Sequence, residues 1–185
     1  MAKIITVKEA AELVQDGAVI GSAVQGMTGW PEEIGLAIEN RFMETGHPSG
    51  ITHIHGAGQG DFGRMSEDGK TCRGECALAH DGLLSCSIHG HVGCSFKVTK
   101  QIVDNKILAY NIPLGVVGQI WREMGRGFPG LLTKVGLGTF MDPRYDGAMI
   151  NEKTKKRKQI VTYIPDFLGE EYLFYTLAQA DSGPF

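Results

Sequence analysis

Short apolar segments that end in glycine-rich turns recur along this chain, and they constrain its fold more than any other feature. The segments with the character of strands are residues 18–23, 51–55, 85–89 and 107–111. Apolar residues at helical spacing predict helices at 6–15, 32–45, 95–104 and 116–126. This alternation predicts an α/β fold with a mostly parallel sheet and helices on both faces. Glycine loops at successive strand ends would gather at the carboxyl edge of the sheet, where open α/β sheets bind ligands.

The first junction between strand and helix shows why such a loop suits a ligand. Residues 18–23 are small and apolar, as in a buried parallel strand. Gly26 and Gly29 then allow the backbone to bend and to approach another group closely. Pro31, followed by two glutamates, fits the first turn of a helix. A tight turn without a ligand explains the same residues, because a single glycine-rich loop is weak evidence.

The last third of the chain carries further strand signals, and the first of these strands is again followed by glycines, at Gly136 and Gly138. Residues 132–135, 160–164 and 172–177 have strand character, and the last two of these segments flank a turn at 166–170. The basic run at 153–158 is predicted to be a solvated loop or a sheet edge.

Composition excludes several classes of partner. The chain has 185 residues, of which 42% are hydrophobic and 21% charged, as is usual for a globular domain. The net charge of −3 gives no basic surface for nucleic acid or an anionic membrane. No apolar run is long enough to cross a membrane, and the N-terminus has charged residues where a signal peptide would have an apolar core. We therefore expect a cytoplasmic protein without nucleic-acid or membrane partners.

Cysteine and histidine are concentrated in one window, within and after a polar, irregular segment at 62–76. The window contains seven potential soft ligands: Cys72, Cys76, His80, Cys86, His89, His91 and Cys94. Its spacing includes no Cys-x2-Cys pair and fits no common zinc motif. Buried free cysteines are the favoured interpretation, and no metal is expected; a structural zinc site is the less favoured alternative. His53 and His55 alternate on a strand, face the same side, and are expected to be hydrogen-bonded packing.

Several segments together carry a family resemblance. The most specific is Thr-Lys-Val-Gly-Leu-Gly-Thr-Phe-Met-Asp-Pro-Arg at 133–144. The remaining segments occur in the right order at 16–31, 42–48, 58–60, 79–83, 90–91, 105–111, 129–132 and 170–175. The chain resembles the amino-terminal half of family I coenzyme A transferases, and in particular the propionate, acetate or acetoacetate type with both halves fused in one chain. The resemblance covers nearly all of residues 3–177.

The resemblance implies a ping-pong reaction that moves coenzyme A (CoA) between a short-chain acyl-CoA and a carboxylate. In this family a glutamate of the carboxyl-terminal half attacks the acyl-CoA and becomes a glutamyl-CoA thioester. No part of these 185 residues matches that glutamate motif. Glu170 and Glu171 lie in a different context and receive no catalytic role. The chain is thus expected to be an α-type half that needs a β-type half, or that self-associates, with CoA as substrate and no cofactor.

The resemblance also implies a set of substrate-binding residues: Gln25, Gly26, Gly29, Gly58, Gln59, Gly60, His91 and Leu114. Gln59 is the main expected polar contact, and a loop-bracing amide is its alternative role. The family's usual Gly-Gly-Phe is Ala-Val-Gln at 23–25, and a glutamine frequent in the family is Leu114 here. Both departures fall where an acyl group would bind.

Residues 1–185 are expected to form a single α-type domain. The end soon after Tyr175 favours a truncated copy over a separate subunit. A second hypothesis is a non-catalytic binding or assembly module derived from such an enzyme, which would self-associate through its uncovered apolar interface. A sugar-phosphate isomerase or deaminase of related fold ranks lower, because fold alone does not fix function.

Overall fold

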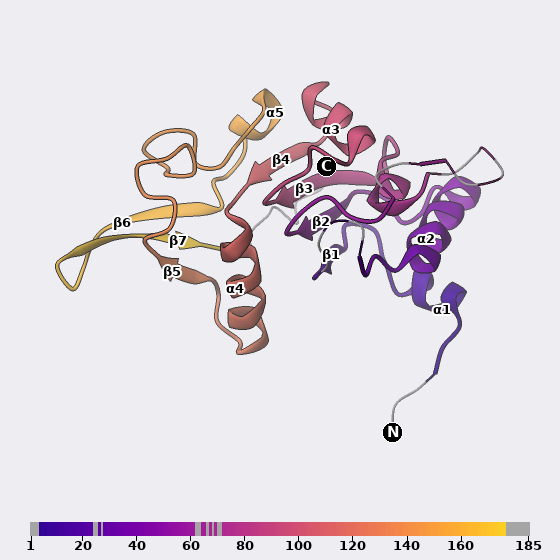
Figure 1. Cartoon of the computed structure of the whole chain (residues 1–185), viewed down its shortest axis with the longest axis horizontal. Coiled ribbons are helices and arrows are strands. Elements are labelled where there is room, and N and C mark those ends of the chain that lie inside the picture. Colours follow the sequence, from indigo (N-terminus) through magenta and orange to yellow (C-terminus); the bar gives the residue numbers. More distant parts are fainter. Residues whose placement is uncertain are drawn as a thin grey trace.

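The main element of the fold is a four-stranded parallel sheet (Figure 1). The computed structural model describes residues 4–23, 26, 28–61, 64, 65, 67, 69 and 72–176. The strands lie in the order of the sequence: β1 (Val19–Ser22), β2 (Ile51–His55), β3 (Leu84–His89) and β4 (Leu108–Asn111). The α/β fold with a parallel sheet, predicted from the alternating pattern, is confirmed.

Helices pack on both faces of this sheet. Figure 1 shows α1 and α2 at one end of the molecule and α4 near its middle, between the parallel sheet and β5. The helices are α1 (Val7–Glu12), α2 (Glu32–Thr45), the 3₁₀ helix η1 (Gly74–Leu78), α3 (Phe96–Val103) and α4 (Leu114–Gly125). The predicted helix at 6–15 is shorter than expected, and η1 lies at the end of the segment that was predicted to be irregular. No helix in the described part of the chain is long and apolar enough to cross a membrane.

Local sequence signals explain where two of these helices begin or end. Thr6 and Glu9 form a capping box at the start of α1: the Glu9 amide donates to Thr6 Oγ1 and the Thr6 amide donates to Glu9 Oε2. At the end of α2, Gly46 adopts a φ of +75° and its amide donates to the Phe42 carbonyl. This left-handed cap ends the helix at residue 45, where the sequence predicted its end.

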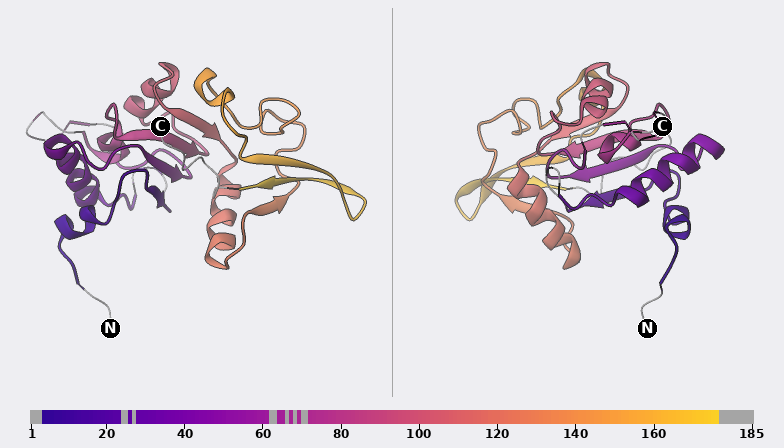
Figure 2. Two further views of the ribbon diagram at one scale, coloured as in Figure 1. Left: turned by 180° about the vertical axis from the view of Figure 1, so that it is seen from behind. Right: turned by 45° about the vertical axis from the view of Figure 1, so that its right-hand side comes forward.

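A second, antiparallel sheet follows in the last third of the chain. It consists of β5 (Leu131–Thr133), β6 (Val161–Phe167) and β7 (Glu170–Tyr175), with β7 in the centre. Figure 2 shows the β6–β7 hairpin projecting away from the parallel sheet. The three predicted strands are present with shifted bounds: β5 ends at Thr133 and not at residue 135, and β6 and β7 extend into the predicted turn at 166–170. Residue 177, where the last strand was expected to end, lies outside the described residues.

The prediction of a loop or sheet edge for the basic run at 153–158 is wrong over its first part. A short helix, α5 (Glu152–Lys155), begins there instead. Asn151 causes it, because its side-chain oxygen accepts the Thr154 amide and caps the helix. The Asn151 amide group also donates to the carbonyls of Ile102 and Ile107, which anchors α5 beside α3 and β4.

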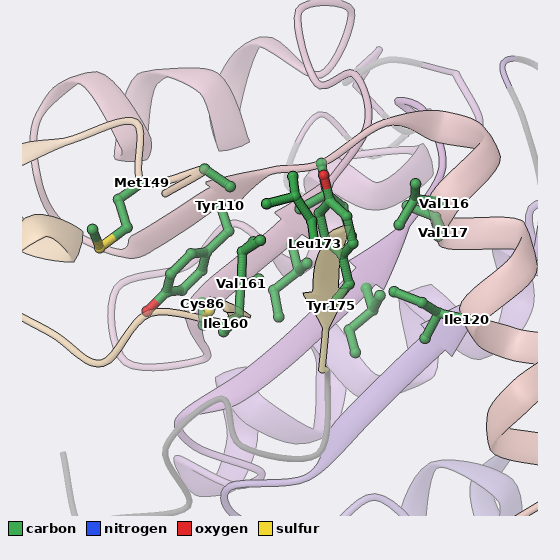
Figure 3. Packing of buried hydrophobic residues seen from close by; sticks show 14 of the residues in the cluster. Cys86, Tyr110, Val116, Val117, Ile120, Met149, Ile160, Val161, Leu173 and Tyr175 are labelled. Atoms are coloured by element: carbon green, nitrogen blue, oxygen red, sulfur yellow. The ribbon is translucent and has the colours of Figure 1, made fainter. Parts of the chain in front are cut away.

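Two apolar clusters hold the layers together. One lies between the parallel sheet and α1, α2, α3 and η1, and includes Ile38, Ile51 and Leu78. The other covers the opposite face, where α4 and the small sheet both contribute (Figure 3). In that cluster Leu173 and Tyr175 of β7 are fully buried in the same group as Ile54 and Ile88. The small antiparallel sheet therefore shares its core with the parallel sheet.

Candidate functional site

The four parallel strands end side by side and place their last residues along one edge. In the sheet register Ser22 pairs with His55, His55 with His89, and His89 with Asn111. The glycine loops that follow are joined by hydrogen bonds: the His91 amide donates to the Gly56 carbonyl at 3.0 Å. The predicted gathering of glycine loops at the carboxyl edge is confirmed.

These loops approach each other too closely for side chains. A Cβ atom on Gly90 would lie 2.6 Å from the Gly56 carbonyl oxygen and 2.7 Å from Leu114 Cγ. One on Gly21 would lie 2.2 Å from the Trp121 ring. Glycine at these positions lets α4 lie directly against the strand ends.

A cavity of about 370 Å³ opens at this edge. Its lining combines small residues with apolar side chains: Ser22, Ala23, Gly56, Leu114, Gly115, Val117, Gly118 and Trp121. The volume is in the range of small-molecule sites, which are concave and mostly apolar with a few polar groups. Ser22 contributes the polar side chain of this lining.

The first turn of α4 borders the same cavity through Leu114 and Gly115. Its N-cap residue is Pro113, which makes no side-chain capping hydrogen bond. The first amides of a helix have no partner within the helix, and they carry the positive end of its dipole. The cavity therefore combines apolar walls with a helix terminus that favours negative charge.

Gln59 supports the loop that follows β1 through hydrogen bonds to Ser22. The residue is fully buried, and its side-chain amide donates to the Ser22 carbonyl at 3.2 Å. Its Oε1 accepts the Ser22 hydroxyl at 2.6 Å. The backbones also join here, because the Gly60 amide donates to the Gly26 carbonyl at 3.0 Å. This geometry gives Gln59 the bracing role; a contact with substrate stays a prediction.

A group of buried polar side chains lies beneath this edge. His53 and His55 stack with ring centroids 4.5 Å apart, and the His89 ring is 5.6 Å from that of His55. Glu75 of η1 is fully buried beside them. Burial raises the pKa of Glu75 to about 8. Burial also lowers the pKa of His55 to about 4, with a smaller contribution from His91, and the pKa of His89 to about 3.

The predicted substrate-binding residues divide between separate places. Leu114 lines the cavity, whereas Gly29 and Gly60 line a smaller hollow of about 190 Å³ beside Trp30. Gly58 lies against Ser95, whose Oγ would be 2.9 Å from an added Cβ. His91 is exposed, and Gly26 adopts a φ of +62° next to Gln59. Gln25 lies outside the described residues.

Sequence analysis missed three residues of this region. Trp121 lies seven positions after Leu114 on α4, and this helical spacing was the signal that would have placed both on one face. Ser22 ends β1, where strand-end position alone points to the sheet edge. Glu75 comes from a polar segment without periodicity, and no local signal marks it.

The cysteines show no sign of a shared site. Cys72, Cys76 and Cys86 are buried and Cys94 is exposed; all are free thiols. Burial raises the pKa of Cys76 to about 11 and that of Cys86 to about 12, so both thiols stay protonated near neutral pH. None of the four belongs to a potential metal-binding group within the described residues.

Comparison with known proteins identifies the family. The family described as "Coenzyme A transferase" matches residues 4–182. The chain belongs to this family. Caffeate CoA-transferase of Acetobacterium woodii is 41% identical over 181 residues, a match that covers 98% of this chain and 32% of that protein. Acetate CoA-transferase YdiF of Escherichia coli K12 is 31% identical, with coverage of 96% and 32%.

Solved structures of CoA transferases have the same fold. The acyl-CoA transferase YdiF of E. coli O157:H7, in a thioester complex with CoA, superposes with a TM-score of 0.81 at 30% identity, covering 93% of this chain and 32% of that one. Glutaconate CoA-transferase of Acidaminococcus fermentans gives a TM-score of 0.63 at 16% identity, covering 95% and 53%, and supports the fold alone. The chain spans about one third of the length of the curated relatives that it matches.

Proposed function

We propose that this chain forms one wall of a site where CoA moves between a short-chain acyl-CoA and a carboxylate. The cavity at the carboxyl edge carries the proposal, because it combines apolar walls with the N-terminus of α4. Membership of the CoA transferase family supports it. The nucleophilic glutamate is proposed to come from a β-type half that completes the site.

The proposed reaction has two half-reactions of the same kind. The glutamate carboxylate attacks the thioester carbonyl, and the C–S bond breaks to give an acyl–glutamyl anhydride and the CoA thiolate. The thiolate then attacks the glutamyl carbonyl, and the C–O bond at that carbonyl breaks to release the first acid as its carboxylate. The second carboxylate then reverses these steps and takes the CoA. Each attack passes through a tetrahedral oxyanion, and the first-turn amides of α4 at Leu114 and Gly115, which have no acceptor within the helix, are suited to stabilise it.

Leu114 and Trp121 are proposed to contact the acyl group. Leu114 is 41% exposed and lines the cavity together with Trp121 and two helix glycines. The apolar wall at Leu114 and Trp121 favours acyl groups that carry no charge where they contact it, because burying an unpaired charge is costly. Since one relative is named for caffeate, the acyl panel to be tested includes caffeoyl-CoA beside acetyl-, propionyl- and acetoacetyl-CoA.

Reconstitution tests this function. The purified chain is mixed with the β-type half of a family I transferase, and CoA transfer from each acyl-CoA to acetate is followed by liquid chromatography. We expect no transfer by the chain alone and transfer in the mixture, with loss on Leu114→Asp. The matched control, Leu13→Asp, changes an exposed leucine in the turn after α1 and should leave transfer unchanged.

Two results would contradict the proposal. One is transfer by the chain alone that disappears in Glu170→Gln or Glu171→Gln, because the nucleophile would then lie within this chain. The other is the absence of transfer with any β-type half, together with a stable self-association seen by light scattering. That second result would favour the binding or assembly module derived from such an enzyme.

A further inference from the structure

Two histidines and a glutamate converge below the carboxyl edge of the sheet. Glu75 Oε2 lies 3.4 Å from His55 Nδ1 and 3.8 Å from His53 Nδ1. One ligand atom from each residue lies within 4.8 Å of the other two. All three residues are buried, with exposed fractions of 2% for His53 and zero for the others. The three residues come from two elements, β2 and η1, that are far apart in the chain.

The hydrogen bonds around His53 place its ring hydrogen on Nε2, so Nδ1 has an electron pair available for a ligand. Gln59 presents its amide nitrogen to the Ser22 carbonyl, so its Oε1 faces the Ser22 hydroxyl. The Ser22 hydrogen is then donated to Gln59, and Ser22 Oγ must accept the hydrogen of His53 Nε2, 2.6 Å away. The neutral ring carries that single hydrogen, so Nδ1 is unprotonated on the side of Glu75.

The ring hydrogen of His55 can lie on either nitrogen, and when it lies on Nε2 the Nδ1 atom is unprotonated. In the structure Nδ1 lies 2.9 Å from the Ala57 carbonyl, to which it donates. Its Nε2 lies 3.4 Å from Ser87 Oγ. With the hydrogen on Nε2, His55 donates to Ser87, and the Ser87 hydroxyl donates to His89 Nδ1 at 2.9 Å. Metal-binding histidines commonly hold their other nitrogen in this way.

Within the described part of the chain, Glu75 has only weak hydrogen-bond contacts, with the Ser95 side chain and the Gln59 backbone. Neither carboxyl oxygen accepts a hydrogen bond of standard geometry, and the side chain is fully buried. A buried polar atom without a partner costs on the order of 1–3 kcal/mol, more for a charged group. In the metal-free protein Glu75 keeps its proton near neutral pH, and this one hydrogen can satisfy only one of the two neighbouring Nδ1 atoms. A cation that displaces the proton and lies between the three atoms satisfies all of them.

We propose that His53 Nδ1, His55 Nδ1 and Glu75 bind a divalent transition metal ion, with Zn²⁺ as the best match. Ligand atoms of a tetrahedral zinc ion with bonds of roughly 2.0–2.1 Å stand about 3.3 Å apart. The 3.4 Å separation fits this spacing, and the 3.8 Å separation needs a shift of a few tenths of an ångström. Because the two rings are stacked and His55 Nδ1 faces the Ala57 carbonyl, both imidazoles must also turn toward the ion when it binds. Two imidazoles and one carboxylate suit Zn²⁺. No fourth Cys, Asp, Glu or His joins the group within the described ranges, so water completes the coordination.

The sequence favoured a protein without metal, and its less favoured alternative was a zinc site in the cysteine and histidine window. The proposed site differs from both. It uses none of the seven residues of the cysteine and histidine window, and it gives the histidines of β2 a role beyond packing. The ion would tie β2 to η1 and, through His53 and Ser22, fix the strand end beside the cavity. Its role is structural support of the site, and the proposal stands whether or not the chain takes part in CoA transfer.

Metal content and cobalt spectroscopy of the whole purified chain test the proposal. After removal of metal with a chelator, one equivalent of Zn²⁺ or Co²⁺ is added and the protein is separated from free metal. We expect one ion per chain, visible absorption bands of a four-coordinate Co²⁺ site, and a higher melting temperature. At a Zn²⁺ concentration about 100 times Kd, linkage predicts a rise of roughly 5–10 °C for a chain of this length.

Variants separate this site from other ways of binding metal. Glu75→Gln and His53→Gln should each lower metal affinity by at least about tenfold and remove the cobalt bands. Glu39→Gln is the matched control, because Glu39 is also a buried carboxylate paired with a histidine, His80, but with only one. The control should retain the ion and the spectrum. Circular dichroism verifies that each variant is folded.

Three outcomes would overturn the proposal. The first is no bound Zn²⁺ or Co²⁺ in the folded parent protein at micromolar free metal. The second is equal metal binding in the parent, Glu75→Gln and His53→Gln. The third is a thiolate charge-transfer band that disappears in Cys94→Ser, because the ion would then be bound by the exposed cysteine.

Discussion

The contact between Gly60 and Gly74 gives the sharpest test of how the loops are built. Gly60 adopts a φ of +73°, and a Cβ atom there would lie 2.5 Å from Gly74 Cα. It would also lie 3.1 Å from two atoms of the Trp30 ring. The neighbour at 2.5 Å is backbone, so no side-chain rotation can relieve the clash. Gly60→Ala therefore combines an unfavourable backbone conformation with a forced separation of two chain segments.

Gly17→Ala isolates the first of these effects. Gly17 has nearly the same φ, +70°, but no atom lies within 4 Å of its added Cβ. A left-handed conformation costs an alanine about 1–2 kcal/mol, so this is the expected loss for Gly17→Ala. Overpacking adds roughly 1–3 kcal/mol, which gives a total of about 2–5 kcal/mol for Gly60→Ala.

Urea denaturation followed by circular dichroism measures both losses. The free energy of unfolding should fall more in Gly60→Ala than in Gly17→Ala, by about 1–3 kcal/mol, without a change in the slope m. Separation of the segments also weakens the hydrogen bond from the Glu75 amide to the Gln59 carbonyl, which is 3.1 Å long in the structure. Equal losses in the two variants would refute the reasoning, because the close approach would then carry no energy.

Three further predictions follow from single residues. Asn151→Ala removes the cap of α5 and two buried hydrogen bonds, so the free energy of unfolding should fall by about 2–4 kcal/mol in a denaturant titration. Burial raises the pKa of Glu75 from 4.5 to about 8, so the native state keeps a proton that the unfolded state loses, and stability falls as pH rises through this range. Histidine titration affects the parent and Glu75→Gln alike, so the difference between their free energies of unfolding isolates Glu75. Between pH 6.5 and 8 this difference should shift against the metal-free parent by roughly 1–2 kcal/mol, as measured by calorimetry in chelator. In the reconstituted transferase, Leu114→Ala should lower kcat/KM for propionyl-CoA by about tenfold, since it removes apolar contact area from the cavity wall; an unchanged ratio would remove Leu114 from the acyl site.

Sequence signals sufficed where an element is specified locally. The bounds of β2 and α2 agree with the prediction, because β2 is flanked by glycines and α2 ends at a left-handed glycine. The predicted loop in the basic run was wrong because Asn151 was not recognised as a helix cap. Its other contacts, to Ile102 and Ile107, depend on the fold and have no counterpart in local sequence.

The candidate site was predictable in position but not in its chemistry. Strand-end glycines located the edge, and the alternation on β2 placed His53 and His55 on one face, as their stacked rings confirm. The bond of Ser22 with Gln59 and the burial of Glu75 needed the sheet register and the packing of η1. Ser22 is 31 positions from His53 and 37 from Gln59, and the periodicity of a local segment gives no information about contacts at such distances in the sequence.

The shared core has a consequence for the order in which the chain can fold during synthesis. Ile54 and Ile88 leave the ribosome long before Leu173 and Tyr175, yet all four are buried in one cluster. Until β7 emerges, one face of the parallel sheet lacks part of its cover and presents apolar surface to other nascent chains. Such a surface is prone to aggregation. The small sheet thus determines when the larger one becomes safe from aggregation, as well as how stable it is.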